Sequence, residues 1–399
     1  MRVIDAREAV RRITPEITAI RTHIHENPEL SLKEYKTCAL LEEYVRKNVD
    51  YDSLKRVGET GLFFTLKGRK PGKGPTIVFR GDIDALPIQE DASMNPCSKV
   101  PGVMHACGHD IHGTINCGAA SILSKMKDRF AGNIYFFIQP AEEILKGAKL
   151  FLEDPDIDWE NIDAVAALHI SAELDAGKIG MRYGAILAST DTFTVKVRGR
   201  SGHAAHVHTF VDPVVASSAI ILSLQSIVAR ETNAAHAVVV STCQIHGGSA
   251  NNIIPDEVTF SGTVRTLDPE DRRHAEESIR RIAESVAGAY RCQAEIVWEK
   301  GVPPFVCEDE WVDRAFRAGK KALGEENVVT MPYAAMGGED FAFIKEKKPG
   351  IFIRLGCRTP GGPYGSAHSP TFYADNACIP VGMLTIISLA ADYLGFEFE

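Results

Sequence analysis

The chain has 399 residues, of which 45% are hydrophobic, and a formal net charge of −9. A domain averages roughly 150 residues, so this length favours two domains over one. The negative charge excludes the basic field that attracts nucleic acid or anionic membrane surfaces, and we therefore expect a small-molecule or peptide ligand.

The cysteines and the N-terminal residues indicate in which cellular compartment the protein works. The nine cysteines contain no Cys-x-x-Cys pair, which is typical of reduced thiols rather than of a disulfide framework. The N-terminal residues are charged where a signal peptide needs an apolar run, and we expect no membrane span of about eighteen apolar residues. We predict a cytoplasmic protein.

The first element expected is a helix with Thr14 as its N-cap and Pro15 at its first position. A second helical pattern runs from His112 to Lys127. Short apolar runs predict buried strands at residues 76–79, 134–138, 164–168 and 351–355. This alternation predicts an α/β sheet with helices on both faces, where ligands bind beyond the carboxyl ends of the strands.

Between residues 185 and 300 the pattern changes to strand, helix, strand, strand, helix, strand, the order of a ferredoxin-like fold. Two helices are expected to begin at Asp212-Pro213 and Asp268-Pro269, each with an aspartate N-cap. The strands are expected at residues 192–197, 237–243, 257–265 and 293–298. We predict that residues 185–300 form a second domain inserted into a first one, which consists of residues 1–184 and 301–399.

The densest group of potential metal ligands is the stretch from Met104 to His112, which holds one thiol, three imidazoles and a carboxylate. The glycine between Cys107 and His109 lets both side chains turn toward one centre. A zinc deaminase is excluded, because its His-x-Glu and Pro-Cys-x-x-Cys motifs are missing. Taken alone, the stretch fits a polar loop at the start of a helix as well as it fits a ligand cluster.

Further candidates follow the predicted strands. The first strand runs into Asp82 and Asp84, the second is followed by Glu142 and Glu143, and the third runs directly into His169. Adjacent carboxylates repel each other unless a cation is near, so one glutamate can bind metal while the other takes a proton from water. On its own, the glutamate pair fits a solvated helix start better.

The fourth strand leads into a loop that carries His368, and either this histidine or His169 alone would more often be an ordinary hydrogen-bonded residue. Together, the candidate ligands supply thiolate, imidazole and carboxylate for two divalent ions. This mixture favours zinc or another late transition metal over magnesium or calcium. The candidate ligands are Cys107, His109, Glu143, His169 and His368. We expect Asp84 to orient one of the imidazoles.

With these candidate ligands, the sequence resembles the aminoacylase-like zinc amidohydrolases. The similar branch is the one that contains hippurate hydrolase, auxin-conjugate hydrolase and N-acetyldiaminopimelate deacetylase. The resemblance covers nearly the whole chain. The motifs that carry it are Arg80 to Pro87, Met104 to His112, Gln139 to Glu143, Gly202 to Ala205, Asn252 to Asp256, Gly262 to Arg265, Gly338 to Phe341 and Ala367 to Pro370.

The resemblance implies a zinc-peptidase-like catalytic domain with a mixed sheet, which holds two divalent ions on the five ligands named above. The ions would be zinc, with manganese, cobalt or nickel as alternatives, and Glu142 would act as general base and then acid. The inserted domain would be a lid that also dimerises. Its His203 would stabilise the oxyanion in the partner subunit, and Asn252 and Arg265 would hold the substrate carboxylate.

The chain departs from this family pattern where substrates are selected. Residues 170–173 lack the usual Trp and Pro, His206-Val207 stands where relatives often have Met-Pro, and Gly338 replaces a common serine. None of these positions is a predicted metal ligand, so the departures bear on the acyl group and the side chain that the enzyme accepts.

We predict a metal-dependent amidohydrolase that cleaves the amide of N-acyl amino acids or related small conjugates. It would work as a homodimer or higher homo-oligomer formed through the inserted domain, without nucleic acid or membrane. A dipeptidase or aminopeptidase of the same fold is the first alternative, although the sequence shows no acidic partner for a free substrate amine. A noncatalytic metal-binding or amino-acid-binding member is the second, and the presence of Glu142 beside the five ligands speaks against it.

Overall fold

The computed structural model describes residues 5–362 and 365–398. The chain forms two compact units. Unit 1 consists of Met1–Gly184, Cys307–Tyr333 and Asp340–Glu399, and unit 2 of Ala185–Val306 and Ala334–Glu339. Unit 2 is therefore an insertion, and the short strands β7 (Gly184–Leu187) and β14 (Phe305–Cys307) lie where the chain passes between the units.

Unit 1 contains a mixed sheet with the order β1-β2-β4-β3-β5-β16-β6-β15 among the described residues. The neighbours β4, β3, β5 and β16 pair in parallel, whereas β1–β2, β2–β4 and β16–β6 are antiparallel. The strands are β1 (Ser53–Val57), β2 (Gly61–Lys67), β3 (Thr76–Asp82), β4 (Asn133–Gln139), β5 (Ala164–Asp175), β6 (Ile179–Met181), β15 (Val328–Thr330) and β16 (Gly350–Arg358). The predicted mixed α/β fold is confirmed.

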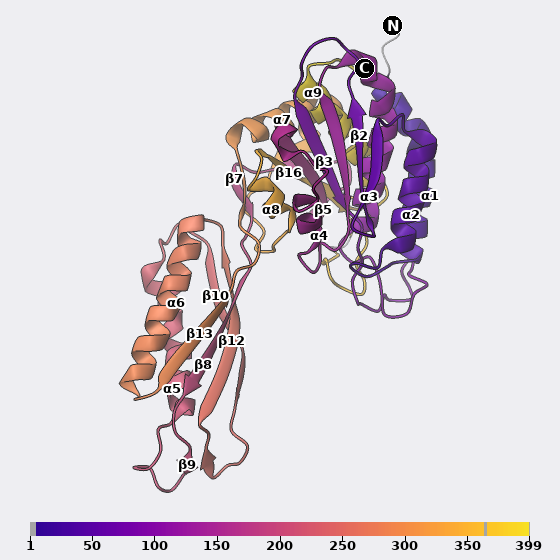
Figure 1. Cartoon of the computed structure of the whole chain (residues 1–399). Coiled ribbons are helices and arrows are strands. Elements are labelled where there is room, and N and C mark those ends of the chain that lie inside the picture. Colours follow the sequence, from indigo (N-terminus) through magenta and orange to yellow (C-terminus); the bar gives the residue numbers. More distant parts are fainter. Residues whose placement is uncertain (1–4, 363–364, 399) are drawn as a thin grey trace. The chain divides into compact units, whose positions relative to one another are not determined.

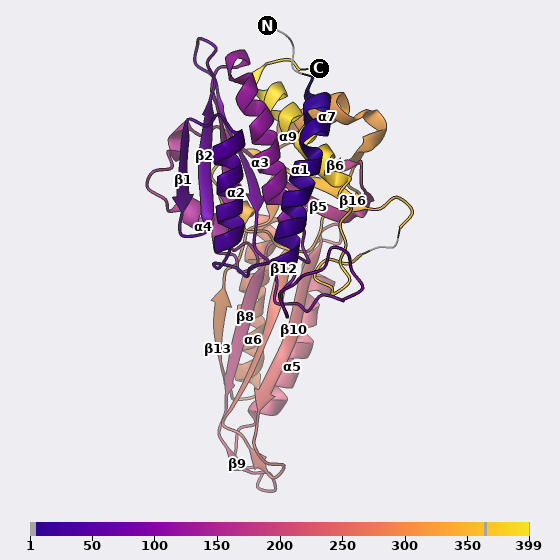
Figure 2. The same cartoon turned by 90° about the vertical axis from the view of Figure 1, so that its right-hand side faces the viewer.

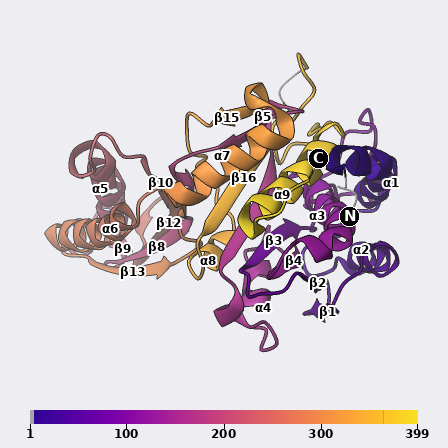
Figure 3. The ribbon, with the colours of Figure 1, turned by 90° about the horizontal axis from the view of Figure 1, so that it is seen from above.

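Helices cover both faces of this sheet, which explains the nearly continuous apolar character of its parallel strands (Figure 1). One layer contains α1 (Ala6–Glu26), α2 (Tyr35–Asn48), α3 (His109–Leu123), α7 (Asp309–Leu323) and α9 (Cys378–Leu394). Figure 2 shows α1, α2 and α3 side by side, and α3 packs on β3. The short helices α4 (Gly147–Leu152) and α8 (Phe341–Lys345) pack together beside β4 and β5 (Figure 3).

Helix α1 begins earlier than the sequence predicts. Asp5 caps it by accepting a hydrogen bond from the Glu8 N–H, and Pro15 lies inside the helix. The prediction of Thr14 as N-cap is wrong: its Oγ1 donates to the Val10 carbonyl at 2.8 Å. Residues 6–13 are mostly good helix formers, and the helix tolerates the missing proline N–H because its apolar face is buried.

Two further boundaries differ from the predictions. Helix α3 starts at His109 instead of His112 and ends at Leu123, where a 3₁₀ turn continues to Arg129. Strand β5 does not end at His169 but continues to Asp175. Its ladder with β16 extends past His169, which pairs with Arg354. His169 is therefore held inside the sheet rather than in a loop.

Unit 2 is ferredoxin-like. Its antiparallel sheet has the order β10-β12-β8-β13, and α5 and α6 bury the apolar side chains of these strands. The predicted caps are confirmed: Asp212 and Asp268 each accept hydrogen bonds from two N–H groups of the following turn. The elements are β8 (Asp191–Arg198), β9 (Gly202–His203), α5 (Pro213–Ser226), β10 (Val238–Gly247), β11 (Ile253–Ile254), β12 (Glu257–Thr266), α6 (Pro269–Ala289) and β13 (Gln293–Glu299).

One helical segment in the described chain, Pro213–Glu231, is long and apolar enough for a membrane span by length and composition. The core helix of a globular domain meets the same criteria of length and composition. Ala216, Ile220 and Leu224 of this segment belong to the core of unit 2, whereas Leu222 is 74% exposed. Apolar side chains therefore lie on both the buried and the exposed face of this helix.

Candidate active site

The predicted site residues of unit 1 gather at one edge of the sheet. Strands β4, β3 and β5 are parallel neighbours, so their carboxyl ends lie at the same edge. Asp82 and Asp84 come from the end of β3, Glu142 and Glu143 from the turn after β4, and His169 from β5. The start of α3 brings in the Cys107 to His109 segment.

The structure brings all five predicted metal ligands together. Ligand atoms of Cys107, His109 and Glu143 lie within 4.8 Å of one another. The Cys107 Sγ is 3.5 Å from the His169 Nε2, and the His368 Nε2 is 3.4 Å from the Glu143 Oε1. His368 has a φ of +60° and is anchored by its N–H, which donates to the Ala106 carbonyl at 2.9 Å.

Hydrogen bonds orient two of the imidazoles toward this cluster. The His109 Nδ1 lies 3.0 Å from the Asp84 Oδ1, and the His169 Nδ1 lies 2.8 Å from the Ile170 carbonyl oxygen. Because a carboxylate and a carbonyl oxygen only accept, each Nδ1 carries a proton and each Nε2 faces the cluster. The buried His109 Nε2 makes no hydrogen bond within the described chain, as expected of a metal ligand.

The surroundings of two of the three imidazoles in the cluster favour positive charge, whereas burial and then His112 hold the pKa of His169 well below the usual value. Cys107 and then Glu143 raise the pKa of His368 to about 10. Burial acts to lower the pKa of His109, yet Asp82 and Cys107 outweigh it and hold that pKa well above the usual value. A site that stabilises protonated imidazoles also stabilises a divalent cation at the same place. Thiolate, imidazole and carboxylate donors fit zinc, so the residues present fit the metal site.

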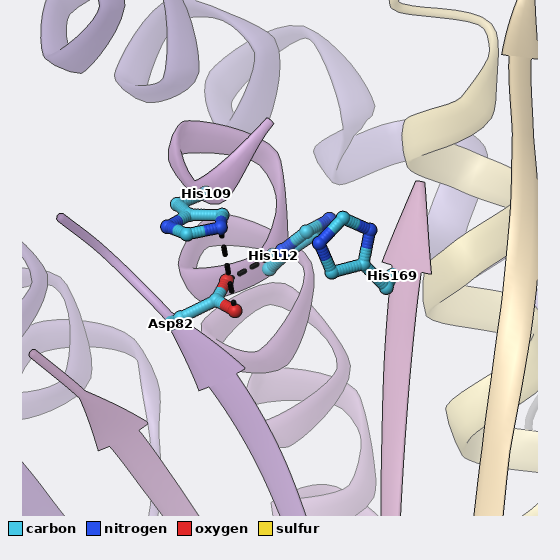
Figure 4. A group of neighbouring side chains, drawn as sticks. All are labelled: Asp82, His109, His112 and His169. Carbon is cyan, nitrogen blue, oxygen red and sulfur yellow. Dashed lines mark hydrogen bonds and ion pairs between the residues drawn. The ribbon is translucent and has the colours of Figure 1, made fainter. Parts of the chain in front are cut away.

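A second group of potential ligands lies deeper and has its own partners. Figure 4 shows Asp82 between His109 and His112, with His169 beside them. The Asp82 carboxylate lies 2.5 Å from the His112 Nδ1 and 2.5 Å from the Arg80 Nη1. The Ile170 N–H donates to the His112 Nε2 at 2.9 Å. Both ring nitrogens of His112 are thus engaged, and Arg80 already supplies a cation beside Asp82. Asp82 and His112 therefore support the neighbouring cluster, to which His109 and His169 belong.

The two adjacent glutamates occupy different positions. Glu143 lies among the donor atoms, and its N–H donates to the Asp84 Oδ2 at 3.0 Å. Glu142 is 6% exposed. Its Oε2 lies 4.0 Å from the His109 Nε2, and its Oε1 accepts from the Asp340 N–H at 3.4 Å. One carboxylate therefore joins the cluster while the other stands beside it, where it can exchange protons with a bound molecule.

Sequence reasoning missed the network under this edge. Arg80 is fully buried and contacts Asp82, the Asp340 Oδ1 at 3.1 Å and the Gln139 Oε1 at 2.9 Å. The signal was present in the sequence as charged residues inside otherwise apolar strands. His105 is also buried, and burial lowers its pKa to about 4. It does not join the donor cluster.

The three predicted residues of the inserted domain lie in unit 2. Exposed His203 in β9 pairs with Ile253 in β11, and the Asn252 backbone carbonyl accepts a hydrogen bond from the Ala204 N–H at 3.0 Å. His203 and Asn252 are therefore close together. Arg265 lies apart from them near the end of β12, where its guanidinium donates to Thr263 and to the Val264 carbonyl.

Comparison with known proteins identifies the family. The model of peptidase family M20/M25/M40 matches residues 78–392. The chain belongs to this family. It is 37% identical to the N-acetyl-L-cysteine deacetylase of Bacillus subtilis over 91% of this chain and 85% of that protein. It is 36% identical to thermostable carboxypeptidase 2 of Saccharolobus solfataricus, with 96% and 97% covered.

A solved structure is similar throughout. It is a Bacillus subtilis protein described as a dinuclear metal-binding peptidase of the M20 family, with a TM-score of 0.85, 32% identity, and 96% of this chain and 99% of that chain covered. The resemblance found in the sequence is thus confirmed, and the protein is a metal-dependent hydrolase that acts on amides or peptides. This excludes the noncatalytic alternative.

Proposed function

We propose that the protein hydrolyses the amide bond of N-acyl amino acids or closely related conjugates, releasing a carboxylate and a free amino acid. The observation that carries this proposal is the convergence of thiol, imidazole and carboxylate donors at the edge of the sheet, with the buried Glu142 beside them. The deacetylase name of the Bacillus subtilis relative supports the substrate class.

The proposed site holds two divalent ions per subunit, bound by Cys107, His109, Glu143, His169 and His368. We propose zinc, because a thiolate combined with imidazoles suits it better than magnesium or calcium, and manganese, cobalt and nickel are the alternatives. When bound, the metals would polarise the amide carbonyl and make a water molecule more acidic. Asp84 keeps the Nδ1 proton of His109 in place, so that the Nε2 faces a metal.

Glu142 is the proposed general base and acid. Its Oε2, 4.0 Å from the His109 Nε2, would take a proton from the attacking water and return it to the nitrogen of the leaving amine. The carbonyl carbon gains the water oxygen, the C–N bond breaks, and the carboxylate and the amine leave. Its neighbour Glu143 cannot take this role, because its carboxylate lies among the donor atoms.

Unit 2 has a proposed role as a lid and dimerisation domain. We propose that His203 stabilises the oxyanion in the partner subunit and that Asn252 and Arg265 hold the substrate carboxylate. Exposed apolar side chains on α5 support self-association over a monomer. They include Val214, Val215 and Leu222. Light scattering of the purified protein tests this part: a dimer supports it, and a monomer at micromolar concentration contradicts it.

A substrate panel tests the proposed reaction. The zinc-loaded enzyme should release amino acid from acetyl, benzoyl or indole-acetyl derivatives faster than from dipeptides with a free amine. Preference for the dipeptides would show a peptidase instead, as the name of the Saccharolobus solfataricus relative suggests. Full metal content without turnover of any amide or peptide in the panel would contradict the proposed substrate class.

A further inference from the structure

Two buried carboxylates hold the turn that carries Glu142 and Glu143. Asp84 accepts a hydrogen bond from the Glu143 N–H at 3.0 Å. From the other side, the Oε1 of Glu34 accepts one from the Ala141 N–H at 2.9 Å. Asp84 belongs to the predicted site, whereas Glu34 comes from the start of α2, far away in the sequence. The backbone on each side of Glu142 is therefore fixed by a carboxylate.

The same oxygen of Glu34 holds a second segment. It also accepts a hydrogen bond from the Leu32 N–H at 3.0 Å. Leu32 has a φ of +62° and Ala141 a φ of +55°, in the left-handed region that a residue with a Cβ adopts at a cost in free energy. One carboxylate thus stabilises two unfavourable backbone conformations, and one of them sets the direction in which Glu142 leaves the strand.

The segment held by Glu34 also touches the metal-binding edge. Ser31, next to Leu32, donates to the Asp84 Oδ2 at 2.7 Å. This is the carboxylate whose other oxygen orients His109. Glu34, Ser31 and Asp84 therefore form a continuous support under the Ala141 to Glu143 turn. The hydrogen bonds of the Glu34 side chain to Leu32 and Ala141 reach backbone N–H groups and none of the donor atoms, so Glu34 would act through the backbone.

An ordinary structural role does not account for Glu34. It occupies the N-cap position of α2, but its side chain makes no capping bond there. The capping bonds come from Glu29, which accepts from the Lys36 and Thr37 N–H groups. Glu34 is 0% exposed, and burial is the largest cause that raises its pKa, to about 6. Keeping an ionisable group there costs free energy that an apolar side chain would not.

We propose that Glu34 is a positioning residue for hydrolysis, which holds the Ala141 turn so that Glu142 points at the donor cluster. The inference rests on the proposed function, in which Glu142 is the base. A displacement of this turn by about 1 Å would be enough to lower turnover strongly, because proton transfer depends on the distance between base and water. Metal binding depends less on Glu34, since Asp84 still holds the Glu143 N–H.

The test compares three single variants of the full-length enzyme. Glu34→Leu removes the acceptor, Glu34→Gln keeps a carbonyl oxygen at the same place, and Glu29→Leu is a matched control that removes a carboxylate from the same loop. For each, kcat, KM, zinc content and Tm are measured. We expect Glu34→Leu to lose about 10-fold or more in kcat with KM and zinc unchanged. Glu34→Gln should keep kcat within about 3-fold of wild type, since its oxygen still accepts.

Glu29→Leu should lower Tm and leave kcat unchanged. If Glu34→Leu does not fold, Glu34→Asp replaces it, because the shorter side chain withdraws the oxygen while keeping the charge. A rescue adds a stricter readout: Ala141→Gly in the Glu34→Leu background should restore part of kcat, since glycine adopts positive φ without support.

Wild-type kcat in Glu34→Leu or Glu34→Asp would overturn the inference. An equal loss in Glu29→Leu would overturn it as well, because it would show a general effect of destabilisation. Glu142→Gln, assayed in parallel, separates this result from a failure of the proposed function. If Glu142→Gln stays active, the base is assigned wrongly and the inference falls with it. If Glu142→Gln is inactive while Glu34→Leu is fully active, only the role of Glu34 is wrong.

Discussion

The two units treat the polar residues of their strands differently. In β12 of unit 2, buried and partly exposed residues alternate, so the polar side chains reach solvent without cost. In β3 of unit 1, all residues are buried, and the strand nevertheless ends in Arg80-Gly81-Asp82. A charge inside a two-sided sheet needs partners. The comparison teaches that buried polar residues at the carboxyl edge of unit 1 mark the functional site more reliably than any single histidine does.

The largest expected effect concerns Glu142, the buried carboxylate that is the proposed general base. Glu142→Gln keeps the shape of the side chain but cannot take a proton at neutral pH. We expect kcat to fall about 10³-fold, within the range typical of general acid–base groups, with zinc content unchanged. Turnover of an N-acyl amino acid and metal analysis of the same sample provide the measurement. A kcat close to wild type would remove Glu142 from the mechanism.

Unit 2 contains a buried ion pair that is expected to have a structural role only. Arg272 donates to both carboxylate oxygens of Asp191 at 2.7 Å, and Asp191 is 0% exposed. Arg272→Leu leaves this carboxylate buried without its cation, which should cost about 3 kcal/mol or more of unfolding free energy. Urea unfolding measures it. The double variant with Asp191→Leu should regain part of the loss, and zinc content should stay normal. If a folded variant loses its zinc, the ion pair of unit 2 affects the metal site of unit 1 and its role is not structural only.

Cys107 tests the donor cluster directly. Cys107→Ser replaces a thiolate by a weaker donor. We expect zinc affinity to fall by about 100-fold or more, because even the loss of a residue that only hydrogen-bonds to a metal ligand can lower affinity by that factor. Competition with a chelator measures the affinity. Cys97→Ser is the matched control, since Cys97 is also partly exposed but lies outside the cluster. Equal affinities in the two variants would show that Cys107 is not a ligand.

The smallest effect is a pH dependence. Burial and then Asp84 raise the pKa of Glu34 from 4.5 to about 6, although hydrogen-bond donors oppose them. Because the folded state binds this proton more tightly, the stability contributed by Glu34 is complete below pH 4.5 and is lost as the pH rises through 6. The unfolding free energy of Glu34→Gln should therefore rise by about 2 kcal/mol relative to that of wild type between pH 4.5 and 7, as urea unfolding at several pH values would measure. If the difference in unfolding free energy between Glu34→Gln and wild type does not change with pH, the pKa of Glu34 is not raised.

Much of the fold follows from local patterns. The apolar runs predict the four central strands because a two-sided sheet demands them, and the Asp-Pro pairs at residues 212 and 268 predict both helix starts of unit 2. Pro15 misled the prediction of α1, since proline is tolerated inside a helix whose apolar face is buried. Strand β5 continues past His169 because the partner strand β16 offers further pairing, which no local signal reveals.

The candidate site was predicted unevenly. The donors were visible because Cys107 and His109 lie in one dense stretch of potential ligands and the other three follow predicted strands. The structure brings all five together. Glu34 was invisible, since its partners Leu32 and Ala141 contribute only backbone N–H groups. A residue that acts through the backbone of a distant segment leaves no spacing or motif in the sequence, and only the folded chain shows it.

The central claim is that five side chains of unit 1 form a centre for two metal ions. Anomalous scattering at the zinc edge from crystals of the zinc-loaded enzyme tests it most directly. We predict two zinc peaks bound by the donor cluster, with the Cys107 Sγ about 2.3 Å from one of them. Zinc bound instead at the Asp82 and His112 group, or no zinc among the five side chains, would contradict the claim.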